Sequence, residues 1–231
     1  QDYFDSALSK AKDLMQTAPQ RMQVIRGSTP DQIEYDPAAN SSAGQLITWV
    51  FIPLVGVSGL FAFERQQGTL RRLLTTPTQL VTYLVGTISG QVRVAIVQMI
   101  LLIGFGILVM RVNWGQDLAG LAVLMVSFAL AAASMGTALG AFVKTEGQAS
   151  GLSMMLGMVM ALLGGCWYPL ELFPDFVRTA VKVLPTTWAM QGMLDLVLRG
   201  QGLSAILPEA GVLLGFAAVF LVIGVARFRY E

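Results

Sequence analysis

The sequence contains no histidine and a single cysteine, Cys166. Without histidine, the common zinc triads, histidine proton relays and Ser–His nucleophile pairs cannot be built. One thiol cannot form an internal disulfide, and alone it makes a poor metal or redox centre. We interpret Cys166 as a packing residue, as buried free cysteines generally are. We therefore expect no enzymatic activity, no metal site and no cofactor bound by this chain.

Charge is scarce as well. Only 13% of the 231 residues are charged and 55% are hydrophobic. In an average soluble domain, about 25% of the residues are charged and about 45–50% are apolar. A net charge of +1 gives no field that would attract nucleic acid. No G-x-x-x-x-G-K-[ST] loop for nucleotide phosphates occurs. These features predict a multi-spanning membrane protein that has no nucleotide site of its own.

The sequence does contain charge-free stretches long enough to cross about 30 Å of hydrocarbon, which takes roughly 20 helical residues. They predict an all-α polytopic membrane protein with five transmembrane helices, at about residues 44–63, 80–110, 118–143, 148–166 and 205–226. The transmembrane domain would then occupy residues 44–231. Arg93 interrupts the second stretch, and we interpret it as snorkelling to the inner membrane boundary rather than contacting a substrate.

Lysine and arginine predict the orientation, because they are enriched in cytoplasmic loops. The denser group is Arg65, Arg71, Arg72, Lys144, Arg227 and Arg229. This places the C-terminus in the cytoplasm and residues 1–43 outside, as the tail of an extracytoplasmic domain. About 40 residues are too few for a stable core, and the chain begins without a signal peptide. We therefore expect a fragment of a longer protein that has a sixth transmembrane helix.

Glycines recur at four-residue spacing in the pairs Gly86/Gly90, Gly136/Gly140, Gly147/Gly151 and Gly211/Gly215. Small residues allow helices to approach closely in lipid, where burial of apolar surface no longer drives association. We interpret these pairs as packing positions within one bundle. The alternative is that some of them form a dimer interface.

The segment between the first two predicted spans has the most informative pattern. Three leucines fall on one helical face, arginines supply positive charge, and Pro77 ends the helix before the next span. This pattern is typical of an amphipathic helix at the cytoplasmic surface. Composition alone favours a lipid-surface anchor.

The order of residues in this segment resembles the cytoplasmic loop of the type 2 ATP-binding-cassette (ABC) exporter permeases. The resemblance rests on Glu64, Gly68, Thr69, Leu70, Leu73, Leu74 and Pro77. Gln67 stands where the family often has a second acidic residue. The resemblance implies a coupling helix that docks on an ATPase subunit. Its candidate residues are Glu64, Arg65, Gly68, Thr69, Leu70, Arg71, Arg72, Leu73, Leu74 and Pro77.

A second region supports the same resemblance, which covers the chain from about Tyr35 onward. Between the last two predicted spans, two short amphipathic segments, 175–183 and 187–199, are punctuated by Trp167, Pro169, Pro174, Pro185 and Trp188. The family has re-entrant outer helices here. Tryptophan suits the membrane interface, and non-helical backbone at membrane depth must be buried in protein or line a wet cavity.

The resemblance implies the membrane-spanning subunit of an ABC exporter in a bacterial or archaeal cell membrane, with six helices in the full protein. A second permease subunit, identical or related, would complete the pathway among the membrane lipids, and two copies of an ATPase subunit would use ATP. The alternative is a non-transporting membrane scaffold or assembly protein. A channel is less favoured, because the sequence shows no ring of acidic residues or filter-like loop. The pattern does not identify a substrate.

Overall fold

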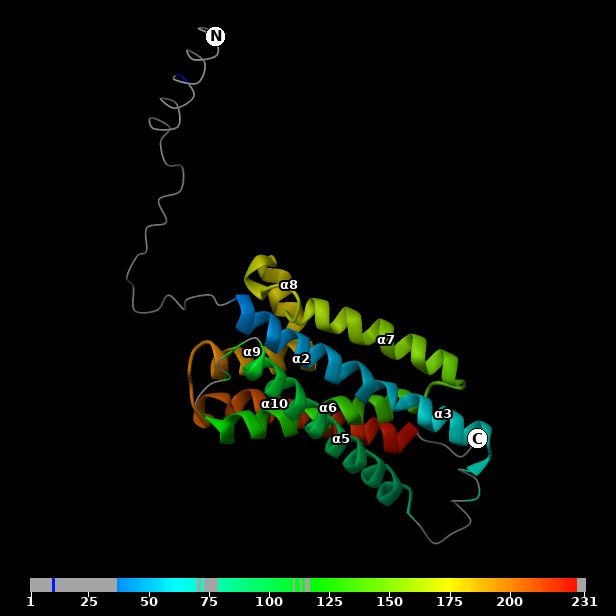
Figure 1. Cartoon of the computed structure of the whole chain (residues 1–231). Coiled ribbons are helices and arrows are strands. Elements are labelled where there is room, and N and C mark those ends of the chain that lie inside the picture. The colour runs from blue at the N-terminus through cyan, green and yellow to red at the C-terminus, as the bar shows by residue number, and fades with distance from the viewer. Residues whose placement is uncertain are drawn as a thin grey trace, which may run out of the picture. The chain divides into compact units, whose positions relative to one another are not determined.

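The computed structural model describes residues 10, 37–69, 72, 79–109, 111–112, 114 and 117–227. The chain divides into two units, residues 1–33 and residues 34–231. Lys10 is the one described residue of the first unit, so the helices below all belong to the second. The described part of this second unit is helical and contains no strand (Figure 1). This confirms the predicted all-α fold class.

The helices follow one another along the chain, with short 3-10 helices, marked η, between the longer α-helices. In chain order they are α2 (Pro37–Gly56), α3 (Ser58–Gln66), α5 (Leu80–Leu108), α6 (Leu118–Gly140), α7 (Glu146–Leu163), η1 (Leu170–Leu172), α8 (Asp175–Ala180), η2 (Val181–Val183), α9 (Pro185–Val197) and α10 (Leu203–Arg227).

Within the described residues, four helical stretches are long and apolar enough to cross a membrane: Pro37–Gln66, α5, α6 and α10. They match four of the five predicted spans within a few residues at most ends. The largest difference is at the start, because residues 37–43, predicted as outer tail, form the first turns of α2. Helix α7 occupies the fifth predicted span but is not among these four, so its crossing of the membrane stays a prediction.

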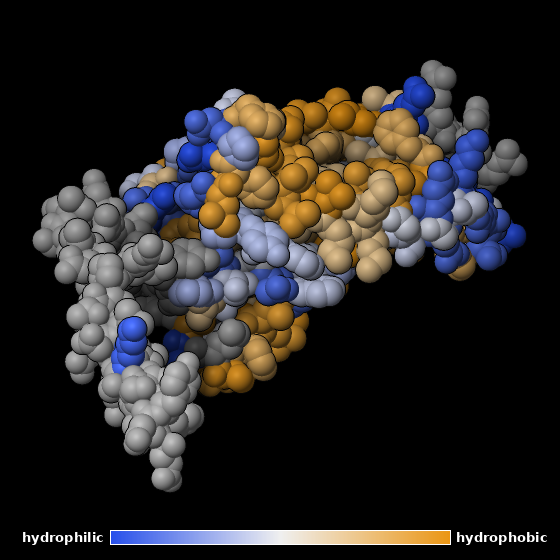
Figure 2. All heavy atoms as spheres, turned by 90° about the horizontal axis from the view of Figure 1, so that it is seen from above, coloured by the Kyte–Doolittle hydropathy of each residue, from blue (hydrophilic) through white to orange (hydrophobic). Residues whose placement is uncertain are grey.

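Helix α6 is the centre of the bundle. It contacts α2, α3, α5, α7, α9 and, most extensively, α10. In their most apolar windows, 61% of the residues of α6 and of Pro37–Gln66 are buried, compared with 22% in α5 and in α10. Helices α5 and α10, which are less buried, therefore present apolar surface to their surroundings. Figure 2 shows apolar side chains over the middle of the molecule and hydrophilic ones at its ends.

Glycines let the interior helices touch. A Cβ at Gly136 would overlap the carbonyl oxygen of Leu54, and one at Gly140 would lie 2.6 Å from Cδ2 of Phe61. Gly44 faces the carbonyl oxygen of Cys166 in the same way. The Gly136/Gly140 pair of α6 thus confirms the prediction that glycine pairs pack helices within the bundle.

The other three glycine pairs behave differently. Among the described residues, a Cβ would meet no heavy atom within 4 Å at Gly86, Gly90, Gly147, Gly151, Gly211 or Gly215. Within that part of the chain, these pairs therefore do not bring helices into contact. Their use in a subunit interface stays a prediction.

The break between α2 and α3 lies at Val57, and α2 continues through Pro53 to Gly56. The chain then makes two i+3 hydrogen bonds, Val57 N–H to Leu54 O at 3.4 Å and Leu60 N–H to Val57 O at 3.0 Å. Ser153 of α7 donates to Val55 O at 3.2 Å, so a buried carbonyl at the break is satisfied from the neighbouring helix.

The glycine contacts give a first prediction. Gly44→Ala should lower the free energy of unfolding by about 1–3 kcal/mol, because its methyl group overlaps the Cys166 carbonyl. Gly86→Ala is the matched control, since its methyl group enters open space. Thermal unfolding in detergent should show a lower Tm for the first variant alone. Equal Tm values for the two variants would contradict this packing.

Candidate functional site

The bundle has two polar ends, which we name after one residue each. The Glu64 end comprises the C-terminus of α3, the N-terminus of α5 and the connection from α6 to α7. The Asp117 end comprises the N-termini of α6 and α10 together with η1, α8, η2 and α9. Glu64 and Arg65, the first of the predicted coupling residues, lie at the Glu64 end, and the predicted outer segment lies at the Asp117 end (Figure 1).

Arg65 joins α3 to the C-terminus of α6. Its Nη1 donates to the carbonyl oxygen of Val143 at 2.9 Å, and its Nη2 donates to that of Gly140 at 3.3 Å. The last carbonyls of a helix lack intrahelical donors and carry partial negative charge. The guanidinium group therefore caps α6 with charge-assisted hydrogen bonds, which are stronger than neutral ones.

Glu64 joins α3 to α5, because its Oε2 accepts a hydrogen bond from the hydroxyl of Tyr83. Helix α3 then ends at Gln66, and Gly68 adopts a positive φ of 68°. A glycine in this conformation is a common helix C-cap, because it has no Cβ to strain. The hydroxyl of Thr69 donates to the carbonyl oxygen of Glu64 at 3.0 Å and holds the turn.

The turn from α6 to α7 is fixed by local bonds. Thr145 caps α7 by accepting from the backbone N–H of Gln148 at 3.2 Å. The Gln148 side chain accepts from the N–H of Lys144 at 3.1 Å, and Gln66 of α3 donates to the Lys144 carbonyl at 3.3 Å. The Glu64 end thus connects α3, α5, α6 and α7 by side-chain hydrogen bonds.

The structure corrects the start of the predicted coupling helix. Glu64 and Arg65 belong to the last turn of α3, because the chain turns at Gly68. Thr69 and Arg72 are helical beyond that turn. The remaining candidates lie outside the described residues: Leu70, Arg71, Leu73, Leu74 and Pro77. Sequence reasoning missed Tyr83, although a polar residue beside a span boundary is a usable signal.

The predicted outer segment folds as short helices that begin at prolines. Pro169 precedes η1, Pro174 precedes α8, and Pro185 is the first residue of α9. Proline suits a helix start, because its missing N–H would have no intrahelical partner there and its φ is already helical.

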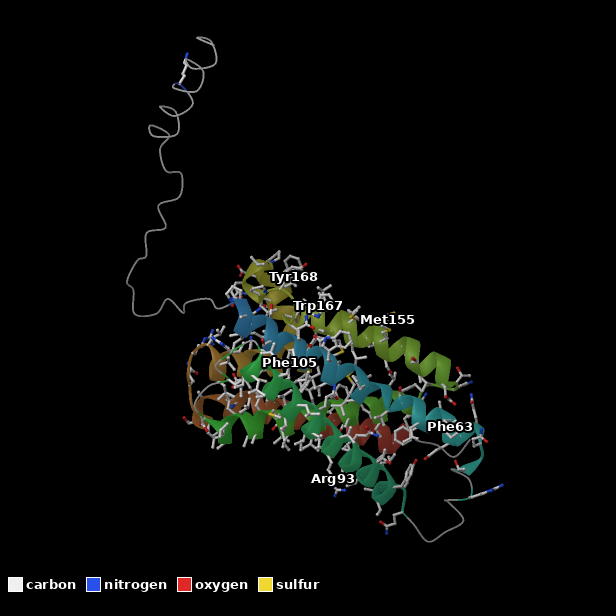
Figure 3. The ribbon with its side chains drawn as sticks, viewed as in Figure 1. Phe63, Arg93, Phe105, Met155, Trp167 and Tyr168 are labelled. Carbon is white, nitrogen blue, oxygen red and sulfur yellow. The ribbon has the colours of Figure 1, made fainter. Side chains whose placement is uncertain are left out.

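Both tryptophans of the outer segment donate hydrogen bonds. Trp167 Nε1 donates to the hydroxyl of Thr48 in α2 at 3.2 Å, and Trp188 Nε1 donates to the Lys182 carbonyl at 2.7 Å. Figure 3 shows Trp167 and Tyr168 together at this end of the bundle. The half-exposed aromatic rings are compatible with the predicted interfacial position.

Asp117 links the N-termini of α6 and α10. Its carboxylate accepts from Gly120 N–H at 3.0 Å and from Leu203 N–H at 2.5 Å. These backbone hydrogen bonds lower the pKa of Asp117, because they stabilise the charged form. The bond from Gly120 has the largest effect on this pKa, followed by the bond from Leu203. The sequence offered no sign of the long-range bond to Leu203.

Arg93 lies near the middle of α5, about 20 Å from Leu80 by helical rise. Its side chain is exposed and points away from the other helices (Figure 3). It therefore does not line a site within this bundle, and its snorkelling to a membrane boundary stays a prediction.

The chain belongs to the ABC-2 family of transporter proteins, because the model of that family matches residues 1–226. It is thus a multi-pass membrane protein of a transporter family.

Two relatives of the chain are named as permeases. The chain is 27% identical over 202 residues to the linearmycin resistance permease protein LnrN of Bacillus subtilis (strain 168), covering 85% of this chain and 51% of LnrN. It is 27% identical over 183 residues to the transport permease YvfS of that organism, covering 77% of this chain and 72% of YvfS. The chain spans about half the length of LnrN. No solved structure matches it significantly.

The Arg65 cap gives a second prediction. Arg65→Met should lower the free energy of unfolding by about 1.5–3 kcal/mol, because carbonyls at the end of α6 lose charged donors. Arg178→Met removes an arginine whose ion pair with Asp175 is exposed, and it should change the stability by less than about 1 kcal/mol. Thermal unfolding in detergent measures both. A Tm loss that is no larger for Arg65→Met would contradict the cap.

Asp117 gives a pH-dependent prediction. Since folding lowers the pKa of this carboxyl, the charged form stabilises the fold above the unfolded-state pKa of about 3.9. That stabilisation is lost as the pH falls through the lower folded-state pKa. Asp117→Ala should therefore have a lower Tm than the wild type at pH 7, and the difference should shrink toward pH 3. A difference that stays constant with pH would rule out this role.

Proposed function

We propose that this chain is the membrane-spanning subunit of an ABC exporter. It moves a substrate outward across the cell membrane while a separate ATPase subunit hydrolyses ATP. The observation that carries this proposal is the bonding at the Glu64 end. There the segment that resembles a coupling loop is attached at its start to helices of the membrane bundle.

The attachment suits the transmission of force. Glu64 is bonded to Tyr83 at the start of α5, and Arg65 is bonded to the end of α6. A push on residues 64–77 therefore acts on α3, α5 and α6 together. Packed helices move as bodies rather than deforming continuously, so closure of the ATPase subunits around ATP can rearrange the bundle.

A pathway between two permease subunits has support from α2. Its exposed residues recur at four-residue spacing at Ser41, Gln45, Trp49 and Pro53. Trp49 Nε1 donates to Gln45 Oε1 at 2.7 Å. Exposed amide groups are unfavourable against lipid. We therefore place this stripe against a second permease subunit, identical or related, with the substrate pathway between them.

The orientation follows from the cations. Arg65, Arg72 and Lys144 lie at the Glu64 end, where two copies of the ATPase would bind in the cytoplasm. Residues 1–43, of which 37–43 form the first turns of α2, are then outside. Nucleotide is bound by the ATPase, and this chain contributes the contact at residues 64–77.

Charge reversal in the loop tests the proposal. Arg71→Glu should reduce both the amount of ATPase that copurifies with the permease and the transport-coupled ATP hydrolysis by about tenfold, because a docking charge is inverted. Arg178→Glu is the matched control at the Asp117 end and should leave both unchanged. Yields of folded protein should be equal for the two variants.

Two results would overturn the proposal. One is normal ATPase binding and coupled hydrolysis in Arg71→Glu. The other is that no ATPase subunit copurifies with the wild-type chain, which would favour a membrane scaffold instead.

A further inference from the structure

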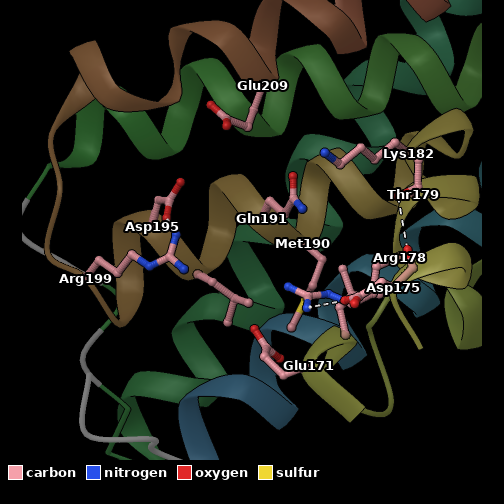
Figure 4. Close-up of a pocket in the computed structure, with 12 residues that line it drawn as sticks. Glu171, Asp175, Arg178, Thr179, Lys182, Met190, Gln191, Asp195, Arg199 and Glu209 are labelled. Atoms are coloured by element: carbon pink, nitrogen blue, oxygen red, sulfur yellow. Dashed lines mark hydrogen bonds and ion pairs between the residues drawn. The ribbon is translucent and has the colours of Figure 1, made fainter. Parts of the chain in front are cut away.

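A cavity of about 540 Å³ lies at the Asp117 end, between η1, α8, η2, α9 and α10 (Figure 4). Its volume is in the range of sites that hold small molecules or parts of them. Charged and amide side chains from all five segments line it. It is distant from the proposed ATPase contact, so its use is independent of that proposal.

Part of the charge in the cavity is already balanced. Arg199 is paired with Asp195 one turn earlier in α9, and Arg178 is paired with Asp175 at 3.4 Å. The three other charged lining residues are Glu171, Lys182 and Glu209. The structure shows no ion pair for any of them among the described residues. The cavity therefore has both an acidic and a basic group available to a ligand.

Glu209 is the most unusual of these groups. Its Oε2 is buried and has no hydrogen-bond donor among the described residues. It lies in the second turn of α10, and its Cβ is near Gly192 of α9. A buried carboxylate oxygen without a donor is destabilising. Lys182 and Gln191 line the same cavity but donate no hydrogen bond to Glu209.

The helices that line the cavity also carry exposed apolar side chains. Leu172 of η1, Phe176 of α8 and Val183 of η2 are 72%, 75% and 69% exposed. In a protein that spans a membrane, such side chains can contact lipid. A charged cavity on helices that also expose apolar residues fits an amphiphile that has a polar head and hydrocarbon chains.

We propose that this cavity binds the head group of an amphiphile that carries a primary ammonium and a phosphate, such as phosphatidylethanolamine. The ammonium N–H groups donate to the carboxylate of Glu209, which lines the cavity. Lys182 binds the phosphate, and the acyl chains run along Leu172, Phe176 and Val183. A quaternary ammonium has no N–H, so it cannot replace the primary one.

Lipid retention tests this assignment. The full chain is reconstituted in nanodiscs of equal parts phosphatidylethanolamine, phosphatidylcholine and phosphatidylglycerol, and native mass spectrometry counts the lipids that remain after release. The wild type should retain phosphatidylethanolamine over phosphatidylcholine by about tenfold. Glu209→Gln should abolish this preference, and Lys182→Gln should weaken retention of phosphatidylethanolamine. Glu146→Gln, which removes a carboxylate at the Glu64 end, should behave as the wild type.

A second measurement identifies the source of the head group. A rise in the Tm of the wild type, but not of Glu209→Gln, with soluble phosphoethanolamine would show that a free head-group compound suffices. Retention of the lipid without that rise would assign the cavity to bilayer lipid.

Equal retention of the three lipids by the wild type, or an unchanged preference in Glu209→Gln, would overturn the proposal. Because Glu209→Gln relieves a buried charge, loss of folding does not confuse the result.

Discussion

The close approach of backbones around α6 is the constraint on which the rest of the structure depends. In lipid, helices gain nothing by burying apolar side chains from water, so association requires contact between atoms of the helices themselves. Gly136 and Gly140 bring α6 against Leu54 and Phe61, and Gly44 brings α2 against the end of the α7 segment. Without these contacts, Arg65 would not reach the last carbonyls of α6.

Helix α6 is held at both ends by side chains from elsewhere in the chain. Arg65 caps its C-terminus from α3, and Asp117 caps its N-terminus while also binding the first N–H of α10. The helix therefore connects the proposed ATPase contact with the Asp117 end of the bundle. Movement at the Glu64 end would reach the neighbourhood of α9 and α10, where the proposed lipid cavity lies, through one well-packed helix.

The sequence predicts the helices well, because charge-free runs and prolines are local signals. Pro169, Pro174 and Pro185 mark helix starts within a residue of where the structure has them. The sequence could not predict that α3 includes Glu64 and Arg65, since their partners lie in α5 and beyond α6 and the contact depends on packing. Nor could it reveal that Oε2 of Glu209 is buried without a donor among the described residues, because burial of an atom depends on how the helices pack.

The central claim is that residues 64–77 receive the ATPase and pass its movement to α6. Hydrogen exchange on the permease, alone and with its ATPase plus ATP, tests it most directly. The account predicts slower exchange at residues 64–77 and at the α6–α7 turn, residues 140–146, when the ATPase binds. Protection confined to the Asp117 end, or unchanged exchange at residues 64–77, would contradict it.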